Sequence, residues 1–277
     1  MKLFPIEGNR MWLDGGSMFG NAPKALWEKW IPADHLNRIL LSCRALLVQT
    51  DAGRNILFET GIGAYLDPKL RERYGVFENE HMLLNNLSAL GFSETDIEGL
   101  VLSHLHFDHA GGLLSAYGEN FRLLFPKAKY YLGKRHWHRA LQPHLREKTS
   151  FIPLLHKLLA DCDRLVLLEG DTHSDLDFVR FHYSDGHTVG LMLSEILQPQ
   201  GQSVLFASDL IPGIPWVHLP ITMGYDRFPE LIVDEKKQLL EELYKKKCLL
   251  FFTHDPVTSF AEIAYNETGK WSALSKR

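Results

Sequence analysis

One stretch of ten residues constrains this chain more than any other, because it carries four potential metal ligands within six positions. The stretch reads S-H-L-H-F-D-H-A-G-G over residues 103–112, and it follows the apolar triplet L-V-L, which is typical of a buried strand. Side chains alternate along an extended chain, so His104 and His106 point to the same side. The chain then turns, and Asp108 and His109 face a second point. The spacing therefore predicts two adjacent metal ions rather than one.

Three further ligand candidates lie later in the chain, each just after an apolar segment that predicts a strand. They are His187 in D-G-H-T, Asp209 in F-A-S-D and His254 in F-F-T-H. Open α/β sheets usually build their sites at the carboxyl ends of strands. The alternative is that these are isolated core or surface residues. Because burying so many polar groups for packing alone is costly, the clustering favours a metal site.

Strands and helices are predicted to alternate along the whole chain. The mixture favours a layered α/β fold, and no linker or low-complexity run divides the chain, so a single domain over residues 1–277 is expected. Strands are predicted at 39–48, 55–59, 100–103, 129–132, 165–168, 177–182, 203–207 and 248–252, and helices at 22–30, 80–90, 135–145, 153–161 and 229–244. The basic and aromatic run 134–139 is interpreted as a solvated helix face with one buried tryptophan.

Amino-acid composition indicates which kinds of binding partner and which cellular compartment suit this chain. The 277 residues are 45% apolar, which is enough for a real core, and the net charge of −4 argues against nucleic acid as the main partner. The three cysteines form no C-x-x-C and suit a reducing compartment. No signal peptide and no membrane span of about 18–20 apolar residues is visible. These features predict a cytoplasmic protein.

The motif H-x-H-x-D-H, followed by distant His, Asp and His, resembles the signature of the metallo-β-lactamase superfamily. The resemblance implies a four-layer αββα sandwich with the metal site between two β-sheet halves. It also implies the ligand sets His104, His106 and His187 for one metal, and Asp108, His109 and His254 for the other, with Asp209 bridging both. Nitrogen and oxygen ligands without thiolate suit Zn²⁺ and also accept Mn, Fe or Co. Many members have Asp-Thr-Gly where this chain has Glu59-Thr60-Gly61, with a longer carboxylate arm.

Within the superfamily, the motif is most similar to the quorum-quenching N-acyl-homoserine lactonases and the methyl parathion hydrolase type. This resemblance implies a hydrolase in which a metal-bridging hydroxide opens a lactone or a related ester. Asp108 is then the candidate proton acceptor, and Tyr225 is the candidate hydrogen-bond donor to the substrate oxyanion. The substrate would be a small molecule with an apolar tail. Met18, Phe19, Phe107 and Trp216 are candidates for an apolar pocket, each with an alternative role in the core or at its rim.

Two other functions stay open. The same two metals could cleave an organophosphate or a phosphodiester, or the chain could be a metal-binding scaffold without catalysis. A β-lactamase is disfavoured, because the thiolate ligand common in those enzymes has no counterpart at Asp209. His218 could be an eighth ligand, but a loop histidine with an ordinary partner is favoured because the ligand set is already full. A homodimer is one option for the assembly.

Overall fold

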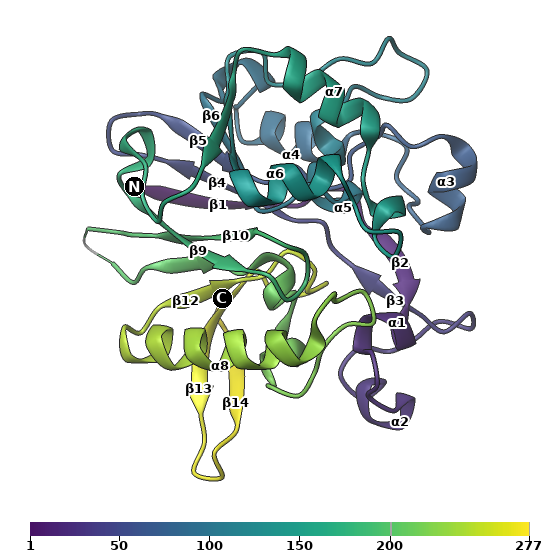
Figure 1. The fold of residues 1–277 in the computed structure, drawn as a ribbon, viewed down its shortest axis with the longest axis vertical. Coiled ribbons are helices and arrows are strands. Elements are labelled where there is room, and N and C mark those ends of the chain that lie inside the picture. The colour runs from purple at the N-terminus through teal and green to yellow at the C-terminus, as the bar shows by residue number, and fades with distance from the viewer. Residues whose placement is uncertain (200, 277) are drawn as a thin grey trace. The chain divides into compact units, whose positions relative to one another are not determined.

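The computed structural model describes residues 1–199 and 201–276. The chain divides into two compact units, and each unit contains a sheet of six strands. Unit 1 comprises Met1–Met11 and Ser42–Glu169, and unit 2 comprises Trp12–Leu41 and the chain from Gly170 onward. The mixture of strands and helices agrees with the predicted α/β class (Figure 1). The single domain over residues 1–277 stays a prediction.

The sheet of unit 1 is mixed. Its strands, in spatial order, are β1 (Lys2–Ile6), β4 (Ala45–Gln49), β5 (Asn55–Phe58), β6 (Gly99–Leu102), β7 (Lys129–Gly133) and β8 (Leu165–Leu168). β5 to β8 run parallel, whereas β1 and β4 are antiparallel to their neighbours. Parallel strands need crossover connections, and helices supply them here. The helices of unit 1 are α3 (Pro68–Arg73), α4 (Met82–Ala89), α5 (Phe107–Ala110), α6 (Lys134–Leu141) and α7 (Pro153–Asp161).

The core of unit 1 lies between its sheet and these helices. Leu57, Leu100 and Leu102 from the sheet join Leu83 of α4 and Leu155 of α7 in one buried apolar cluster. All residues of β5 and β6 are buried, as expected for strands covered on both faces. The rigid sheet therefore fixes the positions of the residues that leave its strand ends.

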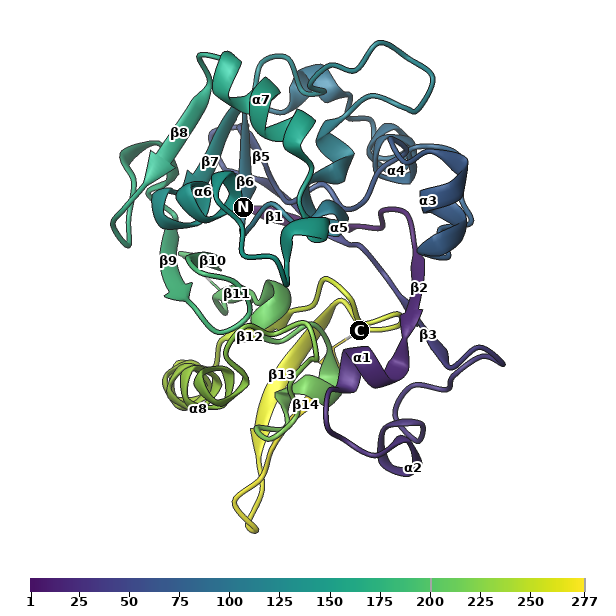
Figure 2. The ribbon, with the colours of Figure 1, turned by 45° about the vertical axis from the view of Figure 1, so that its right-hand side comes forward.

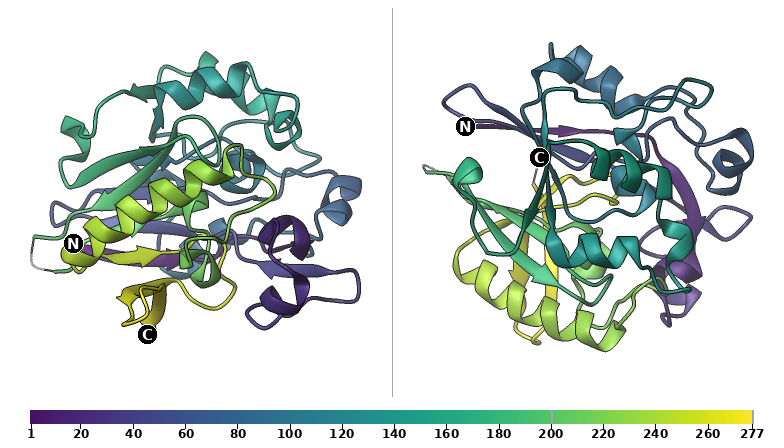
Figure 3. Two further views of the ribbon diagram at one scale, coloured as in Figure 1. Left: turned by 60° about the horizontal axis from the view of Figure 1, so that its bottom comes forward. Right: turned by 45° about the horizontal axis from the view of Figure 1, so that its top comes forward.

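The sheet of unit 2 contains one parallel pair. Its strands, in spatial order, are β14 (Trp271–Lys276), β13 (Phe260–Tyr265), β12 (Leu249–Phe251), β11 (Val204–Phe206), β10 (Leu191–Ile196) and β9 (Val179–Ser184). Only β11 and β12 are parallel in this sheet, so their carboxyl ends meet at one edge. The helix α8 (Pro229–Lys245) packs against β13 (Figures 2 and 3). Its buried residues recur at helical spacing, with Ile232, Leu239 and Leu243 on the inner face.

The remaining elements are short. β2 (Met11–Asp14) and β3 (Arg38–Leu41) form a two-stranded sheet, and α1 (Gly15–Phe19) and α2 (Lys24–Trp27) lie between them in the sequence. Six 3₁₀ turns complete the described part of the chain: η1 (Glu94–Asp96), η2 (Gly111–Leu113), η3 (Lys148–Ser150), η4 (Ser174–Leu176), η5 (Ser208–Leu210) and η6 (Ile214–Val217).

A stack of three aromatic rings secures α1 and α2 within unit 2. The ring of Phe19 lies between those of Trp27 and Trp216, with centroid distances of 5.3 and 4.6 Å and nearly parallel planes. The indole N–H of Trp216 donates a hydrogen bond of 2.9 Å to the Met18 carbonyl. All three rings are buried. Trp216, Met18 and Phe19 are therefore core residues of unit 2, which was the alternative to the predicted pocket lining.

The predicted elements are found, with differences at their ends. The predicted strand 39–48 is interrupted by residues 42–44 and forms β3 and β4, and the predicted helix 22–30 shortens to the four residues of α2. Strands β1, β2, β10, β13 and β14 and the short helices α1, α3 and α5 were not predicted. In β1, Pro5 hides the strand pattern, but β1 is an edge strand, where a missing N–H is tolerated. Within the described residues, no helix combines the length and apolar character that a membrane crossing requires.

Gly112 tests how closely two loops of unit 1 approach. A Cβ at this position would lie 2.2 Å from the Thr60 carbonyl oxygen, so the backbone would have to move. We expect Gly112→Ala to lower the free energy of unfolding by about 1–3 kcal/mol, measured by urea denaturation. The control Gly170→Ala has no atom nearer than 3.9 Å and should stay within about 0.5 kcal/mol of the native protein. Equal stability of the two variants would contradict the close approach.

Candidate metal centre

The four ligand candidates of unit 1 lie at the carboxyl end of β6 and in the first turn of α5. His104, His106, Asp108 and His109 are all buried. The ring of His104 lies 4.5 Å from that of His106 and 4.1 Å from that of His109, measured between centroids. Three imidazoles thus lie close together in this unit, and their assignment to two metals stays a prediction.

The carboxylate of Glu59 orients two of these histidines, His109 directly and His104 through the Ser103 hydroxyl. Its Oε2 accepts a hydrogen bond of 2.8 Å from Nδ1 of His109, and its Oε1 accepts one from the Ser103 hydroxyl. The Ser103 oxygen is in turn 2.9 Å from Nδ1 of His104. In both histidines the Nδ1 side is engaged, which leaves the Nε2 lone pair for a metal. The long-armed Glu59 is therefore an orienting group, placed by the parallel pairing of β5 with β6.

The turn after β5 clamps the ligand loop through its backbone. The Thr60 N–H donates to the His109 carbonyl at 3.0 Å, and the Gly112 N–H donates to the Gly61 carbonyl at 2.9 Å.

Glu59 itself adopts a positive φ of 62°, a conformation that side chains disfavour. Ser208, directly before Asp209, does so too, at 43°. Strain of this kind persists where surrounding contacts hold it, and it concentrates at functional sites.

Helix α6 also supports the loop, although its sequence suggests a solvated face. His136 is fully buried, and its Nε2 accepts a hydrogen bond of 2.9 Å from the N–H of Leu105, between two ligand candidates. Arg139 pairs with the buried Glu147, whose carboxylate lies 3.9 Å from Nε2 of His106. Sequence reasoning missed these three groups, and their basic and aromatic surroundings gave no usable signal.

The three ligand candidates of unit 2 also meet within their unit. Asp209 and His254 follow the parallel strands β11 and β12, and His187 lies in the turn between β9 and β10. Nε2 of His187 is 3.2 Å from Oδ2 of Asp209, and Nε2 of His254 is 3.1 Å from Oδ1. Two ligands of one tetrahedral zinc ion lie about 3.3 Å apart. Each oxygen of this carboxylate is thus paired with a different histidine, as expected of a bridging ligand.

A carboxylate orients His187 as well. Oδ1 of Asp226 accepts a hydrogen bond of 2.9 Å from Nδ1 of His187, and its Oδ2 accepts one from the Met223 N–H at 2.7 Å. The Nε2 of His187 therefore carries the lone pair on the side of Asp209. Asp226 was not predicted as a site residue. The neighbouring residue Tyr225 was predicted as a site residue. Tyr225 is 43% exposed, and its contact with the substrate stays a prediction.

A buried lysine secures the loop that follows Asp209. The ammonium of Lys236 on α8 donates to the carbonyls of Ile221 and Trp216 at 2.6 and 3.0 Å, and approaches that of His218 at 3.5 Å. Burial lowers the pKa of Lys236 to about 7, and the charge of Asp226 acts in the opposite direction. The side chain thus connects α8 to the loop between two functional residues.

The donor set of each unit fits a divalent metal. It consists of buried imidazoles and carboxylates, with no thiolate among them, and Nδ1 of His104, His109 and His187 is engaged by a neighbouring group. Such nitrogen and oxygen donors suit Zn²⁺ and also accept Mn, Fe or Co. In unit 1, Asp108 lies 3.7 Å from Nε2 of His109. Burial, and then Tyr74 and Asp108, raise the pKa of Tyr65. His218 lies outside the groups that could hold a metal among the described residues.

Comparison with known proteins identifies the family of this chain and several similar proteins. The sequence model of the Metallo-beta-lactamase superfamily matches residues 38–254. The N-acyl homoserine lactonase AiiA of Bacillus thuringiensis subsp. kurstaki is 27% identical over 186 residues, which are 64% of this chain and 63% of that protein. The chain thus matches somewhat less than two thirds of this relative's length.

Solved structures share the fold over nearly their whole length. A probable metal-dependent hydrolase from Staphylococcus aureus superposes with a TM-score of 0.88 at 25% identity, covering 100% of this chain and 97% of that one. AidC, a dizinc quorum-quenching lactonase in complex with a product, superposes with a TM-score of 0.79 at 24% identity, covering 99% and 94%.

Glu59 is the first group to test. Removing a partner that orients metal-binding histidines typically lowers metal affinity about 10–100-fold. We therefore expect Glu59→Gln to bind Zn²⁺ that much more weakly, measured by competition with a chromophoric chelator. Glu59→Asp, which keeps the charge on a shorter arm, should lose less, and the exposed Glu28→Gln should lose nothing. Native affinity in Glu59→Gln, with the fold intact by circular dichroism, would contradict the orienting role.

Lys236 should make stability depend on pH. Its folded pKa of about 7 lies below the ordinary 10.5, so between these values the unfolded chain binds a proton that the folded chain lacks. The free energy of unfolding should then rise with pH in this window, by up to about 1.4 kcal/mol per pH unit relative to Lys236→Met. Its exposed neighbour Lys237→Met should keep the native slope. Parallel pH curves for all three proteins would rule out the shifted lysine.

Proposed function

Because this chain belongs to the metallo-β-lactamase superfamily, we propose that it is a metal-dependent hydrolase that opens a lactone of the N-acyl homoserine type or a related ester. The family match and the likeness to solved structures confirm the α/β fold that the sequence predicts. The lactonase relative and the structure of AidC support the choice of substrate class. The apolar-tailed lactone is the substrate that we propose for this chain.

We propose that the ligand groups of the two units together hold two divalent metals, and zinc is the first choice because AidC is a dizinc enzyme. The observation that carries this proposal is the carboxylate of Asp209, whose two oxygens pair with Nε2 atoms of different histidines. When bound, such metals lower the pKa of water and polarise a carbonyl oxygen. The proposed ligands are His104, His106 and His187 for one metal, Asp108, His109 and His254 for the other, and Asp209 for both.

The side chains of this chain would then divide the work. Glu59 and Asp226 keep the imidazoles His109 and His187 in one tautomer, so that no reorientation is needed when substrate binds. Asp108 takes the proton from the attacking water and passes it to the leaving alkoxide as the ring opens. Tyr225 is proposed to donate a hydrogen bond to the developing oxyanion.

One assay tests this function. Zinc-reconstituted protein should hydrolyse acyl-homoserine lactones with a higher kcat/KM than an aryl ester, an organophosphotriester or nitrocefin. Asp108→Asn should lower lactone turnover about 10²–10⁴-fold with the metal retained, because the variant cannot accept the proton. The exposed Asp163→Asn is the matched control and should keep native turnover.

The other outcomes separate the alternatives. Unchanged turnover in Asp108→Asn, with two metals bound, would refute the proton transfer. Faster cleavage of the phosphotriester would favour the organophosphate hydrolase. Stoichiometric binding of metal without turnover of any of these substrates would favour a scaffold without catalysis.

A further inference from the structure

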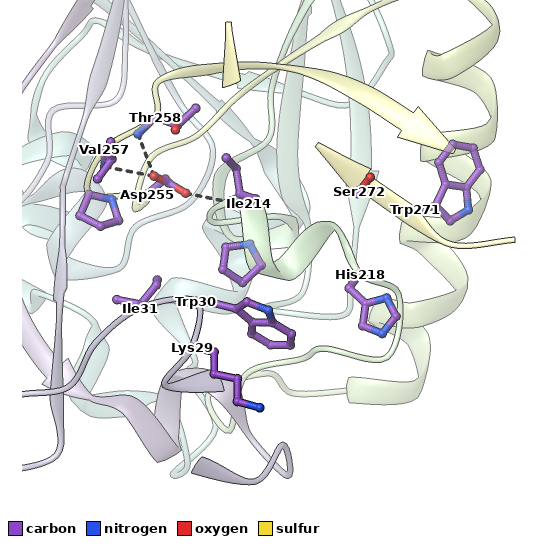
Figure 4. Close-up of a pocket in the computed structure, with 12 residues that line it drawn as sticks. Lys29, Trp30, Ile31, Ile214, His218, Asp255, Val257, Thr258, Trp271 and Ser272 are labelled. Atoms are coloured by element: carbon purple, nitrogen blue, oxygen red, sulfur yellow. Dashed lines mark hydrogen bonds between the residues drawn. The ribbon is translucent and has the colours of Figure 1, made fainter. Parts of the chain in front are cut away.

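Unit 2 contains a cavity of about 620 Å³ that the proposed hydrolase function does not use. Four segments line it: residues 29–31, which follow α2; residues 214, 215 and 218; residues 255–258; and the start of β14 (Figure 4). None of the seven proposed metal ligands lies in its wall. The volume is in the usual range for small-molecule sites, about 300–1,000 Å³.

Most of the wall is apolar and partly open to solvent. Trp30 and Trp271 contribute aromatic surface, and Ile214, Pro215 and Val257 contribute aliphatic surface. Trp30 is 38% exposed and Val257 is 89% exposed, which is unusual for large apolar side chains that meet at one cavity. An apolar ligand chain would remove this surface from water.

Two polar groups of the wall have no partner in the described part of the chain. The half-buried imidazole of His218 forms no hydrogen bond there, and the exposed ammonium of Lys29 forms no ion pair there. Burial, and then the charges of Lys270 and Lys236, lower the pKa of His218. The ring is therefore neutral at pH 7 and offers one N–H donor. Both groups, and the positive field around them, favour an anionic acceptor.

The one carboxylate in the wall is already engaged. Oδ2 of Asp255 accepts a hydrogen bond of 3.0 Å from the Ile214 N–H, and its Oδ1 accepts bonds of 3.0 and 2.8 Å from the N–H groups of Val257 and Thr258. Figure 4 shows these bonds at the side of the cavity away from His218 and Trp271. Asp255 therefore braces two wall segments against each other, and its charge is turned into the loop.

We propose that this cavity binds a carboxylate that carries an unbranched apolar chain. The carboxylate accepts a hydrogen bond from the N–H of His218, the positive charge of Lys29 on the wall favours the anion, and the chain lies against Trp30 and Trp271. The inference stands on the cavity of unit 2 and does not depend on the proposed hydrolysis.

Calorimetric titration of the metal-loaded protein tests this ligand. Hexanoate, octanoate and decanoate should bind with affinity that rises about fourfold per added methylene. Burying one methylene contributes about 0.8 kcal/mol of binding free energy, which corresponds to this factor. Decyltrimethylammonium, which has the same chain and the opposite charge, should bind at least tenfold more weakly than decanoate. Equal affinity for the two ions, or no saturable binding of decanoate, would overturn the proposal.

Variants locate the bound ion. His218→Leu keeps the apolar wall but removes the donor, and should weaken decanoate binding about tenfold, in line with a hydrogen bond to a charged group. Lys29→Glu should weaken it about fivefold, whereas Lys69→Glu on α3 makes the same charge change elsewhere and should leave it within twofold. If decanoate binds all three variants as it binds the native protein, the ion lies outside this cavity and the proposal fails.

Discussion

Imidazoles and carboxylates removed from water need hydrogen-bond partners, and this requirement governs both ligand groups of the protein. A buried polar group without a partner costs several kcal/mol, so each buried ring must be engaged on at least one nitrogen. Glu59 meets this need in unit 1, and Asp226 meets it in unit 2. The same bonds determine the tautomer, and they leave the other nitrogen for a metal. Stability and readiness for metal binding thus come from the same contacts.

The surrounding framework contributes rigidity at some cost in strain. Two of the five non-glycine residues with positive φ in the described residues, Glu59 and Ser208, lie in or next to the groups that hold a ligand. The buried Lys236 secures the loop that connects Asp209 with Asp226. Backbone strain and a buried ammonium each lower the stability of a fold. Because these features lie beside the ligand candidates, we infer that they hold the ligand side chains in position.

Much of the ligand group is predictable because it is local. The alternation of His104 and His106 along an extended strand end requires only the backbone period, and in the structure their rings lie 4.5 Å apart between centroids. The strand-end positions of Asp209 and His254 are also visible from the apolar runs before them. The joining of the two ligand groups into one dinuclear centre, the homodimer and the cytoplasmic location stay predictions.

The amino-acid sequence alone determined the kinds of ligand, their order and the α/β succession of elements, because these depend on residue type and local periodicity. Only the tertiary structure decided that Glu59 orients His109, that His136 turns inward from a basic helix, and that four distant segments line a cavity with His218 in its wall. These relations depend on which strands pair and in which register. Local patterns do not encode that choice, since it is made by the packing of residues that lie tens of positions apart.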